Sequence, residues 1–482
     1  MAAFEDLSAR ELATAIRRRE ISAREVLDAH YARMDAINPA INAVVTQCRE
    51  RAYDEAARAD DRTTSGADLP PLHGVPMTHK DTNNTRGIRT TQGSPVFKDF
   101  VPDFDDVVIE RFRAAGVIST GKNNVPEFGA GSHSFNEVFG TTRNPYDATR
   151  SAGGSSGGAA AAIAARIQPL GDGSDMGGSL RNPAAFCNVF GFRPSLGAVP
   201  MAPTRNAYQW LTRTGPMARS AEDIALAMSV LTGPDPRVPF ACPVDAGDFT
   251  VLLSGAPASD DARSLAGVRV GLTSDFGLGT PVEDEIVETV LEQAAVFEEL
   301  GAEVTPAQPD LSDADQVFGN TRAFDMALNL GTVLAEHGDL VKPEVHWNVE
   351  KGLALTATDL VETALARTRL HLAVRRFFDE FDVLLGPTTQ VLPFDASLRY
   401  PAEVAGVAMT TYIEWMRSVC VISATGCPAI SVPAGFSASG LPVGVQLVAA
   451  NGEDVLLLRV AQAYDRVTRH ASRAPSLAGA GA

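Results

Sequence analysis

Residues 151–181 read SAGGSSGGAAAAIAARIQPLGDGSDMGGSLR, an alanine-rich segment between two turns built from glycine and serine. The apolar run at 159–167 predicts a helix, and the glycine pairs on either side of it predict tight turns. In each turn a serine directly follows two glycines, Ser155 in the first and Ser179 in the second. Glycine lets the backbone aim several N–H groups at one point, so the second turn could stabilise a tetrahedral oxyanion.

Lysine is rare in this chain. Of the 41 basic residues only five are lysine, namely Lys80, Lys98, Lys122, Lys342 and Lys351. Arginine does not lose its proton in a protein, whereas a buried lysine can become a neutral base. Lys80 follows the turn-forming stretch PLHGVPMTH at 71–79, which makes it the best candidate for such a base.

Three other features of the sequence could indicate a different function: nucleotide binding, metal binding or an α/β-hydrolase nucleophile. GVISTGKN at 116–123 approaches the phosphate-binding pattern G-x-x-x-x-G-K-[ST], but Asn123 replaces the required hydroxyl and Pro126 follows where a helix should continue. The eight histidines include no H-E-x-x-H motif and no pair at metal-binding spacing, so we expect no metal and no cofactor. GSSGG at 154–158 fits the nucleophile elbow G-x-S-x-G with Ser156 as nucleophile, but loop residues precede it instead of a strand.

Several segments together resemble the amidase signature family. They are the 153–158 and 175–179 turns, the 74–81 stretch GVPMTHKD, and shorter matches at 121–128, 190–195, 215–220, 385–388 and 441–447. Ser155 follows Lys80 by 75 residues and precedes Ser179 by 24, and both spacings are similar to those of the family. The resemblance covers nearly the whole chain and is strongest over 70–220.

The resemblance implies a Ser-Ser-Lys triad that hydrolyses carboxylic amides, with esters and carbamates as further substrates of the family. Ser179 would attack the carbonyl and form an acyl-enzyme, Ser155 would relay the proton, and Lys80 would be the terminal base. The backbone N–H groups of Met176, Gly177, Gly178 and Ser179 would form the oxyanion hole.

In the family the relay serine follows a cis peptide bond, which here would be the bond from Gly154 to Ser155. Asp175 and Arg181 stand where family members support the nucleophile turn.

His79 and four aromatic residues are further candidates for a place in the site. His79 stands where the family usually has a small or apolar residue, and we favour a packed neutral ring over a charged group that keeps Lys80 deprotonated. Four aromatic residues, Phe128, Tyr208, Trp210 and Trp415, could line an apolar acyl pocket, although single tryptophans are at least as often core residues.

Two other functions stay open. Glutamine-hydrolysing subunits of tRNA-dependent amidotransferases belong to the same family, but they usually carry glutamine after the arginine at position 181, where this chain has Asn182. An inactive homologue that acts as a binding protein would have no need of Lys80, Ser155 and Ser179.

Strands and helices alternate along the chain. A strand–helix–strand unit is expected at 268–272, 282–300 and 302–305, with further strands at 383–385 and 429–432. The pattern predicts an α/β fold with a mixed, largely parallel twisted sheet covered by helices on both faces. We expect one domain over 1–482, with an N-terminal helical segment at about 1–60 and a surface connection at 235–266.

The composition limits the classes of molecule that this chain is expected to bind. The net charge of −18 opposes binding to nucleic acid or to an anionic membrane surface. Five scattered cysteines without a C-x-x-C pair indicate reduced thiols, and the N-terminus does not resemble a signal peptide, so we expect a cytoplasmic protein. We therefore expect a small-molecule amide as substrate, no nucleic-acid or membrane partner, and leave a homodimer open.

Overall fold

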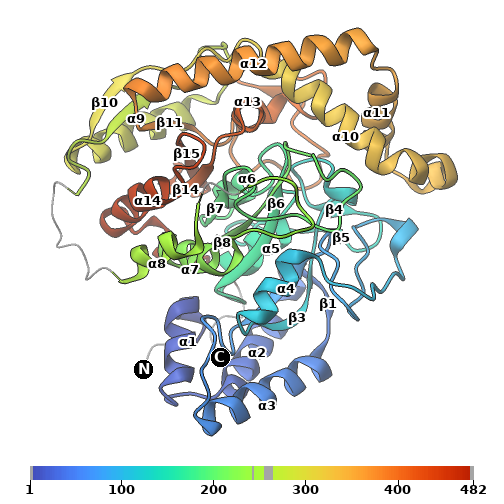
Figure 1. Cartoon of the computed structure of the whole chain (residues 1–482), viewed down its shortest axis with the longest axis vertical. Coiled ribbons are helices and arrows are strands. Elements are labelled where there is room, and N and C mark those ends of the chain that lie inside the picture. Colours follow the sequence, from blue (N-terminus) through green and yellow to red (C-terminus); the bar gives the residue numbers. More distant parts are fainter. Residues whose placement is uncertain (1–3, 242–243, 255–263, 478–482) are drawn as a thin grey trace.

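One large sheet and one small sheet organise the chain, and helices flank the large sheet (Figure 1). The computed structural model describes residues 4–241, 244–254 and 264–477. In spatial order the large sheet consists of β10 (Glu303–Pro306), β9 (Arg269–Leu272), β11 (Val383–Pro387), β15 (Pro442–Val448), β14 (Ala429–Phe436), β7 (Phe190–Arg193), β8 (Arg213–Ala218) and β6 (Leu170–Asp175). The mixed α/β fold with a helix-flanked sheet is thus confirmed.

Strand direction differs from the expectation. Only the neighbouring pairs β10–β9 and β9–β11 are parallel, whereas the other five pairs of the sheet are antiparallel. The sheet is therefore mixed but not largely parallel. Hydrophobic runs show where strands lie and not which way they run, so the sequence pattern could not distinguish the two cases. The predicted parallel strand–helix–strand unit is present as β9, α9 (Asp284–Glu299) and β10.

The small sheet carries Lys80. It has the order β1-β3-β2, where β1 is Val44–Gln47, β2 is Pro76–Lys80 and β3 is Ile118–Asn123. The other strands within the described residues form two short antiparallel pairs: β4 (Phe135–Asn136) with β5 (Gly140–Thr141), and β12 (Glu403–Val404) with β13 (Val407–Ala408).

The remaining helices are α1 (Ala9–Arg17), α2 (Ala23–Ile41), α3 (Arg49–Ser65), α4 (Val107–Ala114), α5 (Gly157–Ala164), α6 (Arg181–Phe186), α7 (Ala221–Leu231), α8 (Ala246–Ser254), α10 (Ala314–His337), α11 (Pro343–Leu353), α12 (Ala357–Glu380), α13 (Arg417–Thr425) and α14 (Asp454–Thr468).

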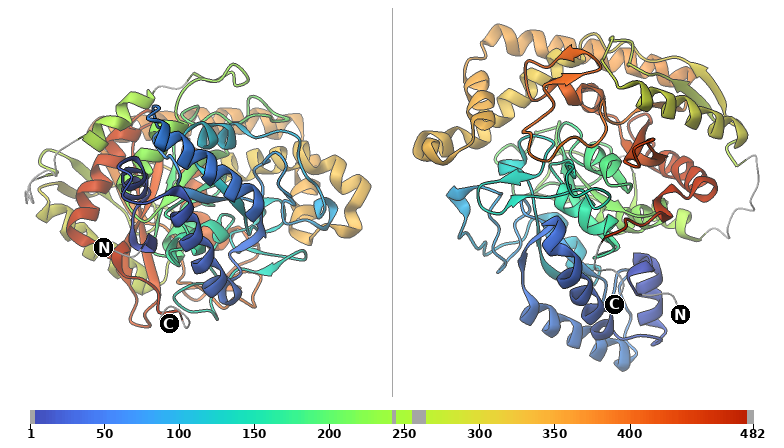
Figure 2. Two further views of the ribbon diagram at one scale, coloured as in Figure 1. Left: turned by 90° about the horizontal axis from the view of Figure 1, so that it is seen from below. Right: turned by 180° about the vertical axis from the view of Figure 1, so that it is seen from behind.

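The N-terminal helices α1 to α3 lie together at one end of the molecule, and α10, α11 and α12 lie at the opposite end (Figures 1 and 2). Capping boxes formed by Ser8 with Glu11 and by Ser22 with Glu25 begin α1 and α2, as their sequence spacing predicts.

The stretch 235–266, expected to be a surface connection, contains helix α8, and the Phe249 side chain of that helix is fully buried. Residues 242–243 and 255–263 of the stretch lie outside the described residues.

Candidate active site

Lys80 lies at the end of β2, in a strand whose five residues are all buried. Its Nζ lies 2.8 Å from the Ser155 hydroxyl oxygen, 2.9 Å from that of Ser156 and 2.9 Å from that of Ser174. The side chain has no solvent exposure. Residues far apart in sequence thus form a closed cluster of one amine and three hydroxyl groups.

Burial lowers the pKa of Lys80 from its usual value of 10.5 to about 7, because the charged form loses its hydration. The carboxylates of Asp172 and Asp175 act in the opposite direction and raise it. The result is an amine that is substantially neutral near pH 7, as a base at this position must be.

Ser155 occupies the turn that leads into α5. The peptide bond between Gly154 and Ser155 is cis, which confirms the expectation from the family resemblance. Gly153 before it has φ of 74°, and a Cβ atom there would lie 2.8 Å from the Cα of Pro183. The close approach to Pro183 requires glycine at this position and brings the turn against α6.

Ser179 occupies the turn that joins the end of β6 to the start of α6. Gly178 has φ of 94°, in the left-handed region, and a Cβ atom there would lie 2.3 Å from a methyl carbon of Val419. A Cβ atom on Gly177 would lie 2.6 Å from the ring of Phe318 on α10. The glycine pair therefore lets α10 and α13 pack directly on the nucleophile turn.

Ser155 and Ser179 both line a cavity of about 130 Å³. Its walls consist of Thr82, Phe128, Gly129, Gly131, Ser155, Ser174, Met176, Gly177, Ser179, Thr212, Arg322, Met326 and Met416. The cavity combines a few hydroxyl groups with apolar side chains and one guanidinium, a composition typical of small-molecule sites.

Ser156, the alternative nucleophile, has no solvent exposure and is not part of the cavity wall. The residues before it form a loop, whereas the strand that leads into a serine-bearing turn is β6, which precedes Ser179. The elbow geometry that Ser156 would need is therefore absent.

One of the four expected oxyanion-hole donors is already engaged. The N–H of Gly178 donates to a carboxylate oxygen of Asp175 at 2.8 Å, so it does not point to the cavity. The hydrogen bonds found among the described residues leave the N–H groups of Met176, Gly177 and Ser179 unused. The donor set is thus reduced from four expected groups to these three.

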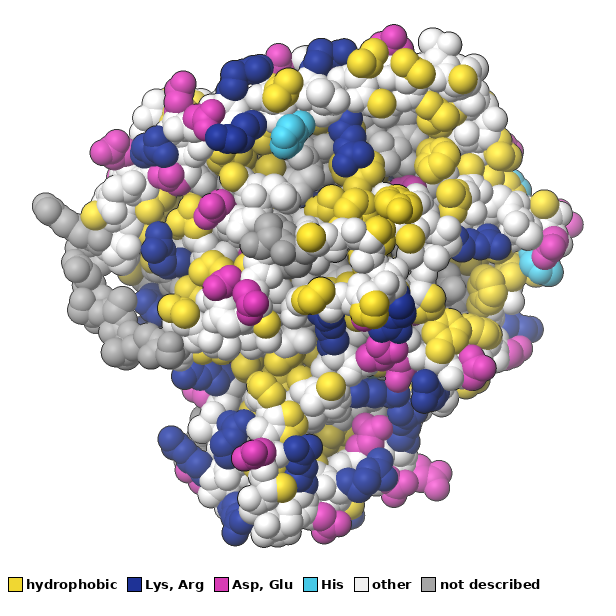
Figure 3. Space-filling view, in the orientation of Figure 1, with side chains coloured by type: hydrophobic (Ala, Val, Ile, Leu, Met, Phe, Trp, Pro, Cys, Tyr) yellow, Lys and Arg dark blue, Asp and Glu magenta, His cyan; other side chains and the backbone are white. Residues whose placement is uncertain are grey.

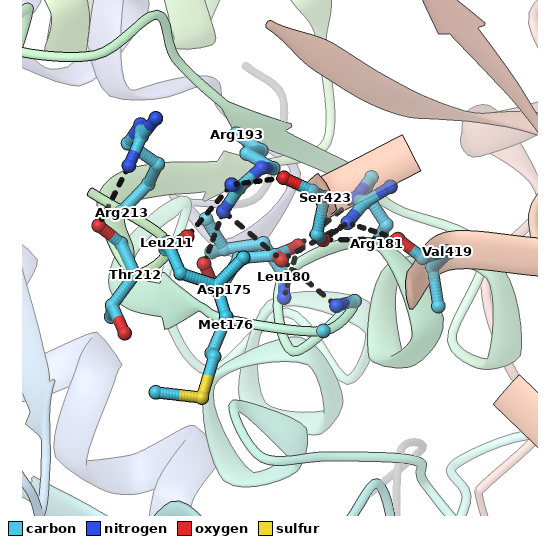
Figure 4. A network of polar contacts seen from close by, with 12 residues as sticks. Asp175, Met176, Leu180, Arg181, Arg193, Leu211, Thr212, Arg213, Val419 and Ser423 are labelled. Atoms are coloured by element: carbon cyan, nitrogen blue, oxygen red, sulfur yellow. Dashed lines mark hydrogen bonds and ion pairs between the residues drawn. The ribbon is translucent and has the colours of Figure 1, made fainter. Parts of the chain in front are cut away.

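Asp175 holds the turn in place together with two buried arginines (Figure 4). Its carboxylate accepts hydrogen bonds from Arg181 at 3.0 and 3.1 Å and forms an ion pair with Arg193 at 3.5 Å. Burial alone would raise the pKa of Asp175, but the two guanidinium groups outweigh that effect and hold the pKa well below its usual range. Asp175 and Arg181 are thus paired next to the turn that carries Ser179, and their supporting role stays a prediction.

His79 is fully buried behind Lys80. Its Nδ1 lies 3.2 Å from an oxygen of Asp172, and its Nε2 lies 2.9 Å from the Ser119 hydroxyl oxygen. The backbone N–H of Lys80 also donates to Asp172, at 3.3 Å. His79 is therefore a packed ring, hydrogen-bonded to a carboxylate that raises the pKa of Lys80.

Of the four predicted pocket aromatics, Phe128 lines the cavity and the other three lie elsewhere. Trp415 is 1 % exposed and packs in the core against Phe186 and Phe394. Trp210 lies beneath the guanidinium of Arg367, and Tyr208 is 72 % exposed.

Hydrophobic side chains gather across the middle of the face shown in Figure 3, between the α10–α12 layer and the N-terminal helices.

Several residues around the site were not predicted from the sequence, among them Asp172, Ser174, Arg193 and Arg322. Asp172 carried a usable signal, since it is a carboxylate between two glycines in the segment that leads to the Ser179 turn. The phosphate-loop-like stretch is strand β3, where the ammonium of Lys122 donates to Asn83 and Thr85 instead of facing a ligand. Across the described ranges no group of three or more His, Cys, Asp or Glu side chains could hold a metal ion.

A model of the family described as Amidase matches residues 25–458. The chain belongs to the amidase signature family. It is 33% identical to an acylamidase of Rhodococcus erythropolis over 478 residues, which cover 98% of this chain and 97% of that protein. It is also 33% identical to a glutamyl-tRNA(Gln) amidotransferase subunit from Heliobacterium modesticaldum, with 98% of each chain covered.

The fold matches a solved bacterial aryl acylamidase of the same family with a TM-score of 0.88, at 29% identity and 96% coverage of both chains. This amidase signature chain is therefore an amide-hydrolysing enzyme. None of the helices within the described residues is long and apolar enough to cross a membrane.

Proposed function

We propose that the chain hydrolyses small carboxylic amides through an acyl-enzyme on Ser179, with Ser155 as proton relay and Lys80 as terminal base. The observation that carries the proposal is the position of Lys80: its Nζ has no solvent exposure and lies 2.8 Å from the Ser155 oxygen. The cavity supports the remaining roles, because Ser155 and Ser179 both face it.

The first step forms the acyl-enzyme. The Ser179 oxygen bonds to the carbonyl carbon, its proton passes to the Ser155 oxygen, and the proton of Ser155 passes to the Lys80 nitrogen. The negative charge that develops on the carbonyl oxygen is met by the unused N–H groups of Met176, Gly177 and Ser179. The carbon–nitrogen bond then breaks, and the proton returns from Lys80 through Ser155 to the leaving nitrogen.

The second step uses water in place of Ser179. Its oxygen bonds to the acyl carbon while one proton moves through Ser155 to Lys80. The bond between the acyl carbon and the Ser179 oxygen then breaks, the carboxylic acid leaves, and the proton returns through Ser155 to Ser179. Asp175 remains ionised throughout and holds the turn through Arg181 and Gly178. Each step therefore begins with a neutral lysine, which explains why burial of Lys80 matters.

The relatives named as amidotransferase subunits support a second candidate, glutamine hydrolysis within a larger complex. The two candidates differ in what the isolated chain can do. Purified chain that hydrolyses acyl anilides without any partner protein supports the amidase, since Lys80, Ser155 and Ser179 all belong to this one chain. Activity that appears only with glutamine and added partner subunits would favour the second candidate.

Ser179→Ala tests the proposal directly. The variant should lose turnover of every amide substrate while its thermal unfolding stays that of the wild type, because the side chain is a small group on the cavity wall. Turnover that survives the substitution would assign the nucleophile to another residue. Esters and carbamates, which share the same acyl chemistry, should be lost together with the amides.

A further inference from the structure

Arg322 is a buried cation on the wall of the proposed reaction site. It lies on α10, one turn after Phe318, whose ring contacts Gly177 of the nucleophile turn. Arg322 is 5 % exposed and lines the same cavity as Ser155 and Ser179. Its guanidinium is therefore within the volume that a small substrate would fill.

The hydrogen-bond partners of Arg322 are all neutral. Its Nε donates to the side-chain oxygen of Asn348 at 3.1 Å, its Nη2 donates to the Tyr412 hydroxyl at 2.7 Å, and its Nη1 lies 3.1 Å from the Met176 sulfur. A thioether is a weak acceptor, so Nη1 retains most of its capacity to donate. Asn348 and Tyr412 fix the plane of the guanidinium. The remaining nitrogen, Nη1, lies beside Met176 on the cavity wall.

No carboxylate forms an ion pair with this guanidinium within the part of the chain that the structure describes. The other arginines of the site, Arg181 and Arg193, form ion pairs with Asp175, whereas none is found for Arg322. Asp325 lies on the same helix three residues later, but its carboxylate accepts a hydrogen bond from Asn206 and forms no ion pair with Arg322. Burial raises the pKa of Asp325 to about 6, and the charge of Arg322 acts in the opposite direction without direct contact. A buried guanidinium without a directly paired carboxylate is costly, and a carboxylate on a bound substrate would offset that cost.

We propose that Arg322 binds a carboxylate carried by the substrate, so that the natural substrate is a small amide with a negatively charged group. The inference rests on the proposed function, since it requires the scissile amide to lie at Ser179 in the same cavity. A guanidinium donates charge-assisted hydrogen bonds to a carboxylate, and Nη1 can donate to one in place of its contact with Met176. Arg322 is then a residue that determines specificity and takes no part in proton transfer.

Two matched pairs of substrates test this proposal on the full-length enzyme. One pair carries the difference on the acyl side, glutaryl p-nitroanilide against pentanoyl p-nitroanilide. The other carries it on the amine side, N-acetyl-4-aminobenzoate against acetanilide. The wild type should prefer the charged member of at least one pair by about 100-fold in kcat/KM, as expected for a desolvated charge-assisted contact. Equal rates within both pairs would overturn the proposal.

Arg322→Gln should reduce that preference to within a few-fold of unity, and Arg322→Lys should restore it only in part, because lysine lacks the planar fork. An unchanged preference in an active Arg322→Gln enzyme would overturn the proposal. If Arg322→Gln does not fold, Asn348→Asp offers a near-isosteric second variant that places a carboxylate beside Nε. Asn348→Asp should also lower the preference for the charged substrate in kcat/KM, and an unchanged preference would again contradict the carboxylate site.

Ser179→Ala separates this inference from the proposed function. Suppose that Ser179→Ala turns over neither the charged nor the neutral substrate of each pair. If the ratio of their kcat/KM values is nevertheless the same in the wild type and in Arg322→Gln, only the carboxylate site is overturned. Persistent turnover in Ser179→Ala would overturn the proposed function, whatever the ratio. Binding of the charged and neutral members to Ser179→Ala, measured by calorimetry, gives the same preference without catalysis.

Discussion

The side-chain nitrogen of Lys80 lies 2.8 Å from the hydroxyl oxygen of Ser155, at a position where the lysine has no solvent exposure. A charged lysine would lose its hydration there, and its pKa is accordingly about 7. We therefore predict that kcat/KM falls as the pH drops below about 7, since protonated Lys80 cannot accept the proton of Ser155. A pH profile of kcat/KM checks this prediction, and a flat profile between pH 5 and pH 8 would contradict it.

Asp172 should set the position of that acid limb. Its carboxylate raises the pKa of Lys80, so Asp172→Asn should lower that pKa and shift the acid limb to lower pH. The same pH profile measures the shift, and Asp359→Asn, at the exposed start of α12, serves as the control that leaves the limb in place. An acid limb that moves to higher pH in Asp172→Asn would contradict the assignment of the limb to Lys80.

Substitution of Lys80 separates a proton-accepting role from a merely positive charge. Lys80→Ala should reduce kcat by about 10²–10⁴-fold, the usual contribution of a general base. Lys80→Arg should not restore activity, because arginine keeps its proton. Lys98→Arg, at an exposed position, provides the matched control and should retain wild-type rates. Recovery of activity in Lys80→Arg would point to an electrostatic role instead.

The two adjacent serines should differ in their effects, although both contact Lys80. Ser155 faces the cavity and Ser156 does not, so Ser155→Ala should lose activity to about the same extent as Lys80→Ala. Ser156→Ala removes one hydrogen bond and should cost no more than about tenfold in kcat. Steady-state kinetics on both variants decide between them, and the reverse order would favour the elbow-type alternative.

The ion pairs around Asp175 should contribute to stability. Arg181→Met leaves a buried carboxylate with only one of its two guanidinium partners and should lower the free energy of unfolding by about 3–5 kcal/mol. Arg369 pairs with Asp313 at the surface, where Arg369 is 56% exposed, and Arg369→Met should cost less than about 1 kcal/mol. Urea unfolding compares the two variants, and equal losses would contradict the structural role of the buried pair.

Much of the site could be predicted because its chemistry lies in short segments. Ser155 and Ser179 stand in glycine-rich turns, and Lys80 ends a short strand that follows a turn containing glycine and proline, so the composition of these segments is itself the signal. Arg322 gave no such signal, because it reaches the site from a helix 146 residues after Met176. Nothing in the local sequence distinguishes it from the other arginines.

The fold shows the same limit. Strands and helices could be located from hydrophobic spacing, whereas strand direction depends on how distant segments pair, as in the antiparallel contact of β11 with β15. Trp415 illustrates the limit for side chains, since a core tryptophan and a pocket tryptophan have the same sequence appearance. Only tertiary packing separates them.

In the proposed mechanism, Ser179 carries the acyl group. Rapid acid quenching during turnover of an activated amide or ester, followed by mass spectrometry of the intact chain and its peptides, tests it most directly. We predict a mass increase equal to one acyl group, located on Ser179 and absent from Ser179→Ala. An acyl group on Ser156 or on any other side chain, or one that persists in Ser179→Ala, would contradict it.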